Sequence, residues 1–144
     1  MSTLQTPVIL VIDAQGGSLG RQLITSIRRE LEHVKILAVG TNSIATTAML
    51  KAGADEAATG ENSVVVACRK AQIIIGPIGM VIANAMLGEI TPAMALAVAD
   101  ADAKRIMIPF SNCDNYIAGV SDVGTGKLIQ DALAQLKKLL LNEG

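Results

Sequence analysis

Short apolar runs alternate with amphipathic segments along most of the chain. Because residues within a run are apolar at consecutive positions, each run is typical of a strand buried on both faces. The sequence predicts strands at residues 8–12, 36–39, 72–75 and 105–108, with shorter ones at 54–57 and 116–120.

The segments between these runs carry helix signals. Leu23, Ile24 and Ile27 recur at helical spacing, and Gly53 is typical of the end of a helix that opens near residue 41. Val64–Val66 favour a strand by propensity, but parallel neighbours need a crossover, so a helix is predicted there. Further helices are predicted over residues 79–87, from 91 onward, and over 126–142.

The alternation of strands and helices predicts one α/β domain over residues 1–144. We expect a single doubly wound, mostly parallel sheet of 5–6 strands in three α/β/α layers, which is a Rossmann-like architecture.

Composition excludes several classes of protein. With 51% hydrophobic and 17% charged residues, the chain is too apolar to be disordered. A net charge of −1 and only two aromatic residues argue against a nucleic-acid partner. One histidine leaves no His-based metal site, and no metal is predicted. The two cysteines and the uncharged first seven residues predict a cytoplasmic protein with reduced thiols.

Residues 71–99 form a long apolar stretch with one charged residue, Glu89. Glycines, prolines and Asn84 interrupt it, so a membrane span is not predicted. The stretch offers more apolar surface than one small core hides, and we therefore expect a homodimer or larger homo-oligomer.

Small and polar residues follow the predicted strands. In a parallel sheet these turns lie together at the carboxyl edge, where open α/β sheets bind ligands. Glycine there allows close backbone approach, and helix N-termini favour an anion. The predicted ligand-binding residues are Asp13, Gln15, Gly16, Gly17, Gly20, Gly40, Thr41, Asn42, Thr59, Gly60, Glu61, Asn62, Gly76, Pro77 and Gly79. For any one of these loops there is an alternative explanation, in which glycine serves only the geometry of the turn and no ligand is bound.

The first loop partly matches the dinucleotide fingerprint GxGxxG. Gly17 and Gly20 match its second and third glycines, but Gln15 replaces the first. No acidic residue ends the second strand, where one would hold a ribose; Thr41 and Asn42 stand there instead. The pattern favours a small-molecule ligand with a phosphate, with a nucleotide or dinucleotide as the candidate cofactor.

Other candidate groups carry less information. Glu61 and Glu89 follow glycines and are candidate acid/base or metal-binding carboxylates, although first-turn helix charge and a solvated loop explain them equally well. His33 lies near the end of the first helix, away from the predicted site. Cys113 has no histidine placed in sequence to activate it.

Several motifs together resemble a family of small bacterial proteins catalogued as a domain of unknown function. They are residues 13–17, 40–42, 51–56, 59–62, 76–79 and 87–92, and the likeness covers nearly the whole chain. The resemblance implies a bacterial cytoplasmic protein with one Rossmann-like domain, and it brings no activity and no catalytic residue.

Three functions stay open from the sequence. The first is a module that binds a nucleotide or small anion at the glycine-rich edge. The second is a small enzyme that uses a bound nucleotide or dinucleotide as cofactor or substrate. The third is a non-catalytic assembly or scaffold protein whose glycines are structural. A lone domain has no second domain to supply substrate contacts, which favours binding over chemistry.

Overall fold

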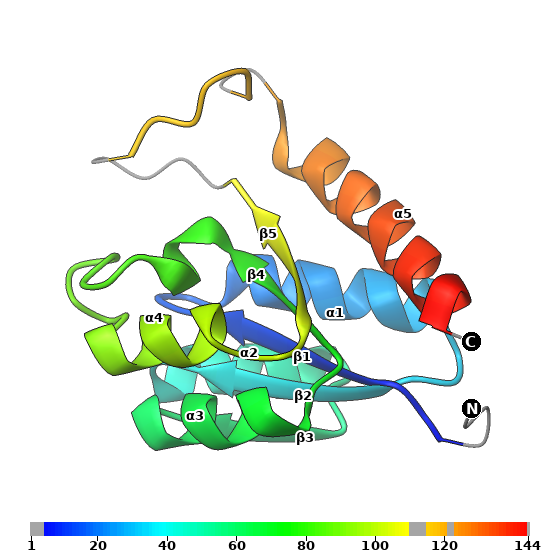
Figure 1. Cartoon of the computed structure of the whole chain (residues 1–144), viewed down its shortest axis with the longest axis horizontal. Coiled ribbons are helices and arrows are strands. Elements are labelled where there is room, and N and C mark those ends of the chain that lie inside the picture. The colour runs from blue at the N-terminus through cyan, green and yellow to red at the C-terminus, as the bar shows by residue number, and fades with distance from the viewer. Residues whose placement is uncertain (1–4, 110–114, 121–122, 144) are drawn as a thin grey trace.

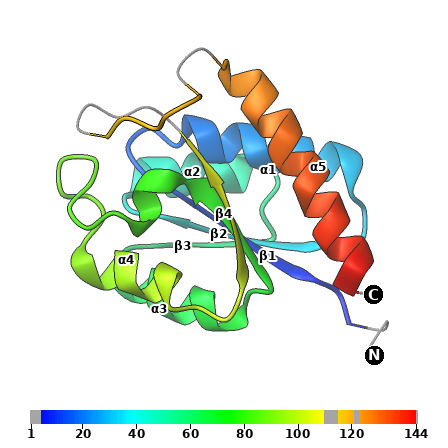
Figure 2. The same ribbon diagram turned by 45° about the horizontal axis from the view of Figure 1, so that its top comes forward.

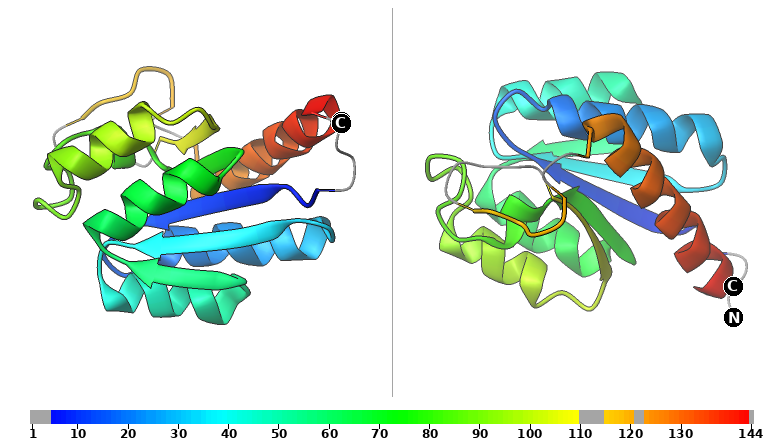
Figure 3. Two further views of the ribbon diagram at one scale, coloured as in Figure 1. Left: turned by 60° about the horizontal axis from the view of Figure 1, so that its bottom comes forward. Right: turned by 90° about the horizontal axis from the view of Figure 1, so that it is seen from above.

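The computed structural model describes residues 5–109, 115–120 and 123–143, and its centre is a parallel sheet of five strands. The strands are β1 (Val8–Asp13), β2 (Lys35–Gly40), β3 (Glu56–Thr59), β4 (Ile73–Pro77) and β5 (Lys104–Ile108). Their order across the sheet is β3-β2-β1-β4-β5, and every pairing is parallel. Figure 3 shows β1, β2 and β3 side by side with their arrowheads pointing the same way.

Helices cover both faces of this sheet, as Figures 1 and 2 show. One face carries α1 (Ser18–Glu30), α2 (Ser43–Ala52) and α5 (Thr125–Glu143). The other carries α3 (Glu61–Lys70) and α4 (Pro92–Ala99), with the short 3-10 helix η1 (Ile78–Val81) after β4. The predicted three-layer, doubly wound α/β architecture is therefore confirmed.

Each central strand is apolar at consecutive positions because it contributes to two cores. Ile9 and Val11 of β1 pack with α1, α2 and α5, whereas Leu10 and Ile12 pack with α3 and α4. All four side chains are at most 1% exposed. Because every pairing is parallel, the carboxyl ends of the strands lie at one edge, where Asp13 of β1 is opposite Gly40 of β2.

The prediction of a sixth strand over residues 116–120 is wrong, because these residues form no strand. Tyr116 is 80% exposed, and Gly119 has a φ of +88°, which belongs to a turn. The third strand is confirmed two residues later than predicted, at Glu56–Thr59. The last helix is confirmed as α5.

The helix predicted over residues 79–87 is also wrong. After η1 the chain forms turns, because Asn84, Met86 and Leu87 have φ values between +57° and +68° and cannot continue a right-handed helix. The N–H of Asn84 donates to the carbonyl of Ile90 at 2.7 Å, which closes these residues into a compact loop. We call residues 82–91 the crossing loop.

Arg28 of α1 joins three segments at the amino edge of the sheet. Its Nε donates to the carbonyl of Gly53 at 2.8 Å, its Nη1 to the carbonyl of Val34 at 3.1 Å, and its Nη2 pairs with Asp55. Asp55 also accepts the backbone N–H of Ile36, and this bond, together with Arg28, holds the pKa of Asp55 below its usual value.

Arg28→Met is expected to lower the free energy of unfolding by about 2 kcal/mol, because two carbonyls and a carboxylate lose their donor. Urea unfolding followed by circular dichroism measures the change. Arg29→Met is the control, since Arg29 is exposed on the same helix. Equal stability of the two variants would contradict this role for Arg28.

Candidate functional site

The candidate site lies at the carboxyl edge of the sheet, where the direction of chain winding reverses. From β1 the chain winds to β2 and β3 through α1 and α2; it then returns through α3 to β4, on the other side of β1. The connections after β1 and β4 therefore leave toward opposite faces, and open α/β sheets bind ligands in the crevice at such a switch point.

Glu89 of the crossing loop joins the loops that follow β1 and β2. Its Oε1 accepts the backbone N–H of Gln15 at 2.8 Å, the hydroxyl of Thr41 at 2.6 Å and the Nδ2 of Asn42 at 3.1 Å. The same Nδ2 donates to the carbonyl of Gln15 at 2.9 Å. One carboxylate thus connects three loops that come from distant parts of the sequence.

The charge of Glu89 is stabilised where it lies. Burial acts to raise its pKa, but the hydrogen bonds from Thr41, Gln15 and Asn42 outweigh burial and hold the pKa below the ordinary value of 4.5. Glu89 is therefore a carboxylate at neutral pH. It also supplies an acidic group beside the end of β2, where the sequence alone shows only Thr41 and Asn42.

Asp13, the last residue of β1, is buried, with an exposed fraction of 6%. Its two oxygens accept the backbone N–H groups of Ala14 at 2.8 Å and Gly20 at 2.7 Å. Burial raises its pKa, and these two hydrogen bonds act in the opposite direction. Because Gly20 lies in the first turn of α1, Asp13 serves that helix as an N-terminal anion.

Packing restricts most of the predicted site glycines, and at Gly17, Gly40 and Gly76 the close contacts include backbone atoms. A Cβ would lie less than 3.0 Å from another atom at Gly17, Gly20, Gly40, Gly76 and Gly79. At Gly17, which also has a φ of +77°, that atom is the Cα of Ala45 in α2. Gly16 and Gly60 differ, since nothing lies within 4 Å of the added Cβ. Only Gly16 of these two lacks a positive φ, so it accepts a side chain without backbone strain.

The structure brings some of the other predicted residues together. Glu61, at the start of α3, accepts a hydrogen bond from the hydroxyl of Thr91 at 2.7 Å, which ties α3 to the N-cap of α4. The hydroxyl groups of Thr59 and Thr46 form a hydrogen bond of 2.7 Å. Asn62 instead lines a groove beside β2 and β3. Pro77 is buried in β4.

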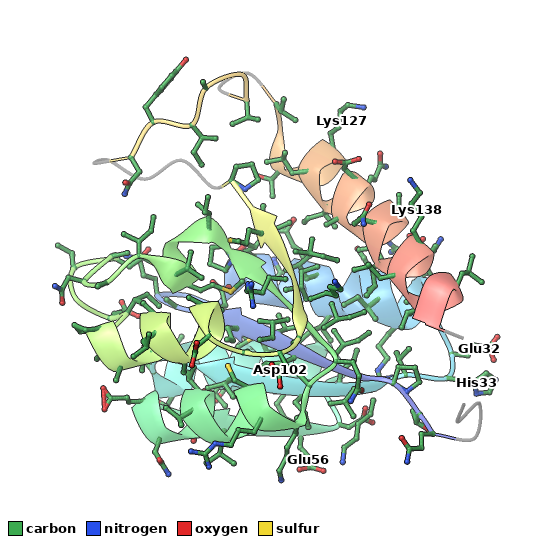
Figure 4. All side chains as sticks on the ribbon, viewed as in Figure 1. Glu32, His33, Glu56, Asp102, Lys127 and Lys138 are labelled. Carbon is green, nitrogen blue, oxygen red and sulfur yellow. The ribbon has the colours of Figure 1, made fainter. Side chains whose placement is uncertain are left out.

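Other candidate groups are placed apart from this site. Figure 4 shows His33 at the opposite end of the molecule from the crossing loop. Burial raises the pKa of Cys68 to about 11, which makes its thiol unreactive at neutral pH. Cys113 lies outside the described residues. Within the described part of the chain, no group of three or more His, Cys, Asp or Glu side chains could hold a metal ion.

Glu89→Ala is expected to lower the free energy of unfolding by about 1–2 kcal/mol at neutral pH, because three donors lose a charged acceptor. The folded pKa of Glu89 lies below the unfolded value, so its contribution is full above pH 4.5 and is lost as pH falls through the folded pKa. Urea unfolding of wild type and variant from pH 7 down to about pH 3 measures the difference. If Glu89→Ala lowered the free energy of unfolding by the same amount at every pH, the role of Glu89 would be steric and the prediction would be wrong. Glu32→Ala is the control for the loss of an exposed carboxylate.

The topology and the switch point together define a Rossmann-like α/β protein. The chain belongs to the family described as a domain of unknown function (DUF3842), whose model matches residues 8–141. The motifs identified in the sequence as a resemblance to such a family are therefore confirmed.

Comparisons with other proteins add a likeness to solved structures. No curated protein matches the sequence significantly. Among solved structures, the chain is similar to the one titled as the crystal structure of a dodecameric FMN-dependent Ubix-like decarboxylase from Escherichia coli O157:H7. The two are 14% identical, with a TM-score of 0.43 over 90% of this chain and 94% of that chain. Of the helices described, none is long and apolar enough to cross a bilayer.

Proposed function

We propose that this protein binds a nucleotide, or another small ligand with both an anionic group and hydroxyl groups, at the switch point. The observation that carries the proposal is the convergence of three loops on Glu89 at the edge where such folds hold ligands. A carboxylate that links these loops fixes the floor of a site before any ligand arrives, which lowers the ordering cost of binding.

The groups left without partners indicate which ligand chemistry fits. The backbone N–H of Gly16 makes no hydrogen bond within the described residues, and Gly16 is exposed. It is therefore a donor for an anionic oxygen. In the same part of the chain, Oε2 of Glu89 accepts no hydrogen bond. That oxygen suits a ligand hydroxyl, as a ribose would provide, and it would repel a bare phosphate.

The proposal is binding without a chemical step. Asp13 is buried, and each of its oxygens accepts a backbone N–H group, so this carboxylate holds the first turn of α1 rather than facing a ligand as a general base. Oε1 of Glu89 is occupied by three donors, and its Oε2 is the oxygen that would accept the ligand hydroxyl. The carboxylates nearest the switch point thus hold the loops together, which supports a binding module over the enzyme alternative.

The test is a thermal-shift and calorimetry panel with AMP, ATP, NAD, adenosine and inorganic phosphate. We expect at least one nucleotide to raise the melting temperature, because a ligand that binds only the folded state stabilises it. Inorganic phosphate alone is expected to give no shift. No shift with any nucleotide at millimolar concentration would contradict the proposal and favour a scaffold role.

Gly16→Val locates the site. The new side chain enters open space where the ligand would approach, so affinity for the nucleotide is expected to fall more than tenfold, which is about 1.4 kcal/mol. Ala134→Val, on the exposed face of α5, adds a comparable apolar group elsewhere and should bind as wild type does. Unchanged affinity in a folded Gly16→Val protein would place the ligand elsewhere.

A further inference from the structure

Helix α4 is apolar around its whole circumference. Its eight residues, PAMALAVA, contain no charged or hydrogen-bonding side chain. Met94, Ala95 and Val98 are buried against the sheet, but Ala93 and Leu96 face outward, and Leu96 is 67% exposed. A helix that is hydrophobic on all sides is typically buried on all sides, so the outer face of α4 lacks a covering partner within the described chain.

The outer faces of α4 and α3 border a groove of about 550 Å³. The two helices pack side by side on the same face of the sheet, as Figure 2 shows. Val65 lines the groove from α3, while Leu96 and Ala97 line it from α4. These residues give the groove an apolar surface, and its volume is large enough to receive a projecting side chain from another molecule.

The rim of this groove carries opposite charges on its two sides. Arg69 lies at the end of α3, and Asp100 and Asp102 follow α4; all three line the groove and are exposed. Figure 4 shows Asp102 in the turn after α4. The ion pairs formed among the described residues join other side chains, so none of these three charges is paired within that part of the chain.

We propose that this groove is the interface of a homodimer, with a second copy of the chain as its occupant. A two-fold axis that lies in the interface and runs along the groove would place α3 of each protomer against α4 of its partner. Because positive and negative charges lie on opposite sides of that axis, Arg69 of each copy would face the aspartates of the other. The same rotation brings Leu96 over the partner's groove and covers the apolar face.

This charge arrangement selects a second copy over an unrelated partner. An isologous interface must be complementary to itself, and a groove that is cationic on one rim and anionic on the other meets this condition. The interface lies on the outer surface of α3 and α4 and uses neither Glu89 nor Gly16. It therefore goes beyond the proposed ligand site, and dimerisation and ligand binding can fail independently.

The first test is the mass in solution. Light scattering coupled to size-exclusion chromatography, at about 50 µM protein, is expected to give twice the chain mass of 14.9 kDa. Leu96→Glu is expected to raise the dimer dissociation constant at least a hundredfold and to give the monomer mass with an unchanged circular dichroism spectrum. Val66→Glu is the matched control, because Val66 is an exposed valine of α3 that lines the separate groove beside β2 and β3.

The second test exchanges the charges. Arg69→Glu alone, and Asp100→Lys with Asp102→Lys alone, each place like charges across the proposed axis and should each weaken the dimer at least tenfold. Mixing the two variants restores opposite charges at both contacts, so native mass spectrometry should show a mixed dimer in preference to either homodimer. A wild-type monomer would overturn the proposal. Dissociation by Val66→Glu rather than Leu96→Glu would also overturn it, as would a mixture that forms no mixed dimer.

Discussion

Gly17→Val is expected to lower the free energy of unfolding by about 3 kcal/mol or more, because two independent costs act at this position. Gly17 has a φ of +77°, a conformation that β-branched residues rarely adopt. Its added Cβ would also lie 2.8 Å from the Cα of Ala45 and 3.0 Å from the carbonyl oxygen of that residue. Ala45 is buried in the first turn of α2, and its backbone atoms cannot move away as a flexible side chain could.

Urea unfolding of Gly17→Val, Gly17→Ala and Gly16→Val separates these costs. The alanine variant keeps the strain and the closest contact but lacks the extra methyl groups, so its loss of stability should be intermediate. Gly16→Val should remain close to wild type, since its side chain enters open space. A Gly17→Val protein as stable as wild type would show that α2 does not pack on this loop as described. Loss of ligand binding by Gly17→Val would therefore not locate the site, whereas loss by Gly16→Val would.

Asp13→Asn is expected to destabilise the fold by about 2–3 kcal/mol. The amide that replaces one carboxylate oxygen is a donor, so either the N–H of Ala14 or that of Gly20 would face another N–H group in a buried site. The variant also removes a negative charge from the N-terminus of α1, where it interacts favourably with the helix dipole. Both effects lower stability, and they are expected to exceed the opposite effect, which is that a neutral amide relieves the cost of burying a charge.

Thermal and urea unfolding of Asp13→Asn measure this loss, and Asp131→Asn, on the exposed face of α5, is the control for removing a carboxylate. Hydrogen exchange gives a local readout, because the amide of Gly20 should lose protection more than amides in the middle of α1. If Asp13→Asn and Asp131→Asn were equally stable, the carboxylate of Asp13 would not hold the first turn of α1.

The sequence by itself determined the architecture of this protein. Runs such as 8–12 are apolar at every position, and only a strand covered on both faces buries all of them, so the pattern required helices on each side of a parallel sheet. The ends of two helices were also set by local sequence signals. Asn42 caps the start of α2 and Gly53 ends it, and Thr91 with Pro92 begins α4. These signals act over a few residues and do not depend on which strands become neighbours.

The tertiary structure alone decided the strand order and the crossing loop. The sequence predicts a helix over residues 79–87, because the apolar residues there favour a helix locally. The observed turns are tied instead to groups far along the chain, and Gln15 and Glu89 are 74 positions apart. The role of each glycine was also decided by the tertiary structure. The sequence gives the positions of the glycines, but packing decides whether the space beside each one is open to a ligand or filled by a neighbouring helix. Only the folded chain brings Ala45 against Gly17 and leaves Gly16 open.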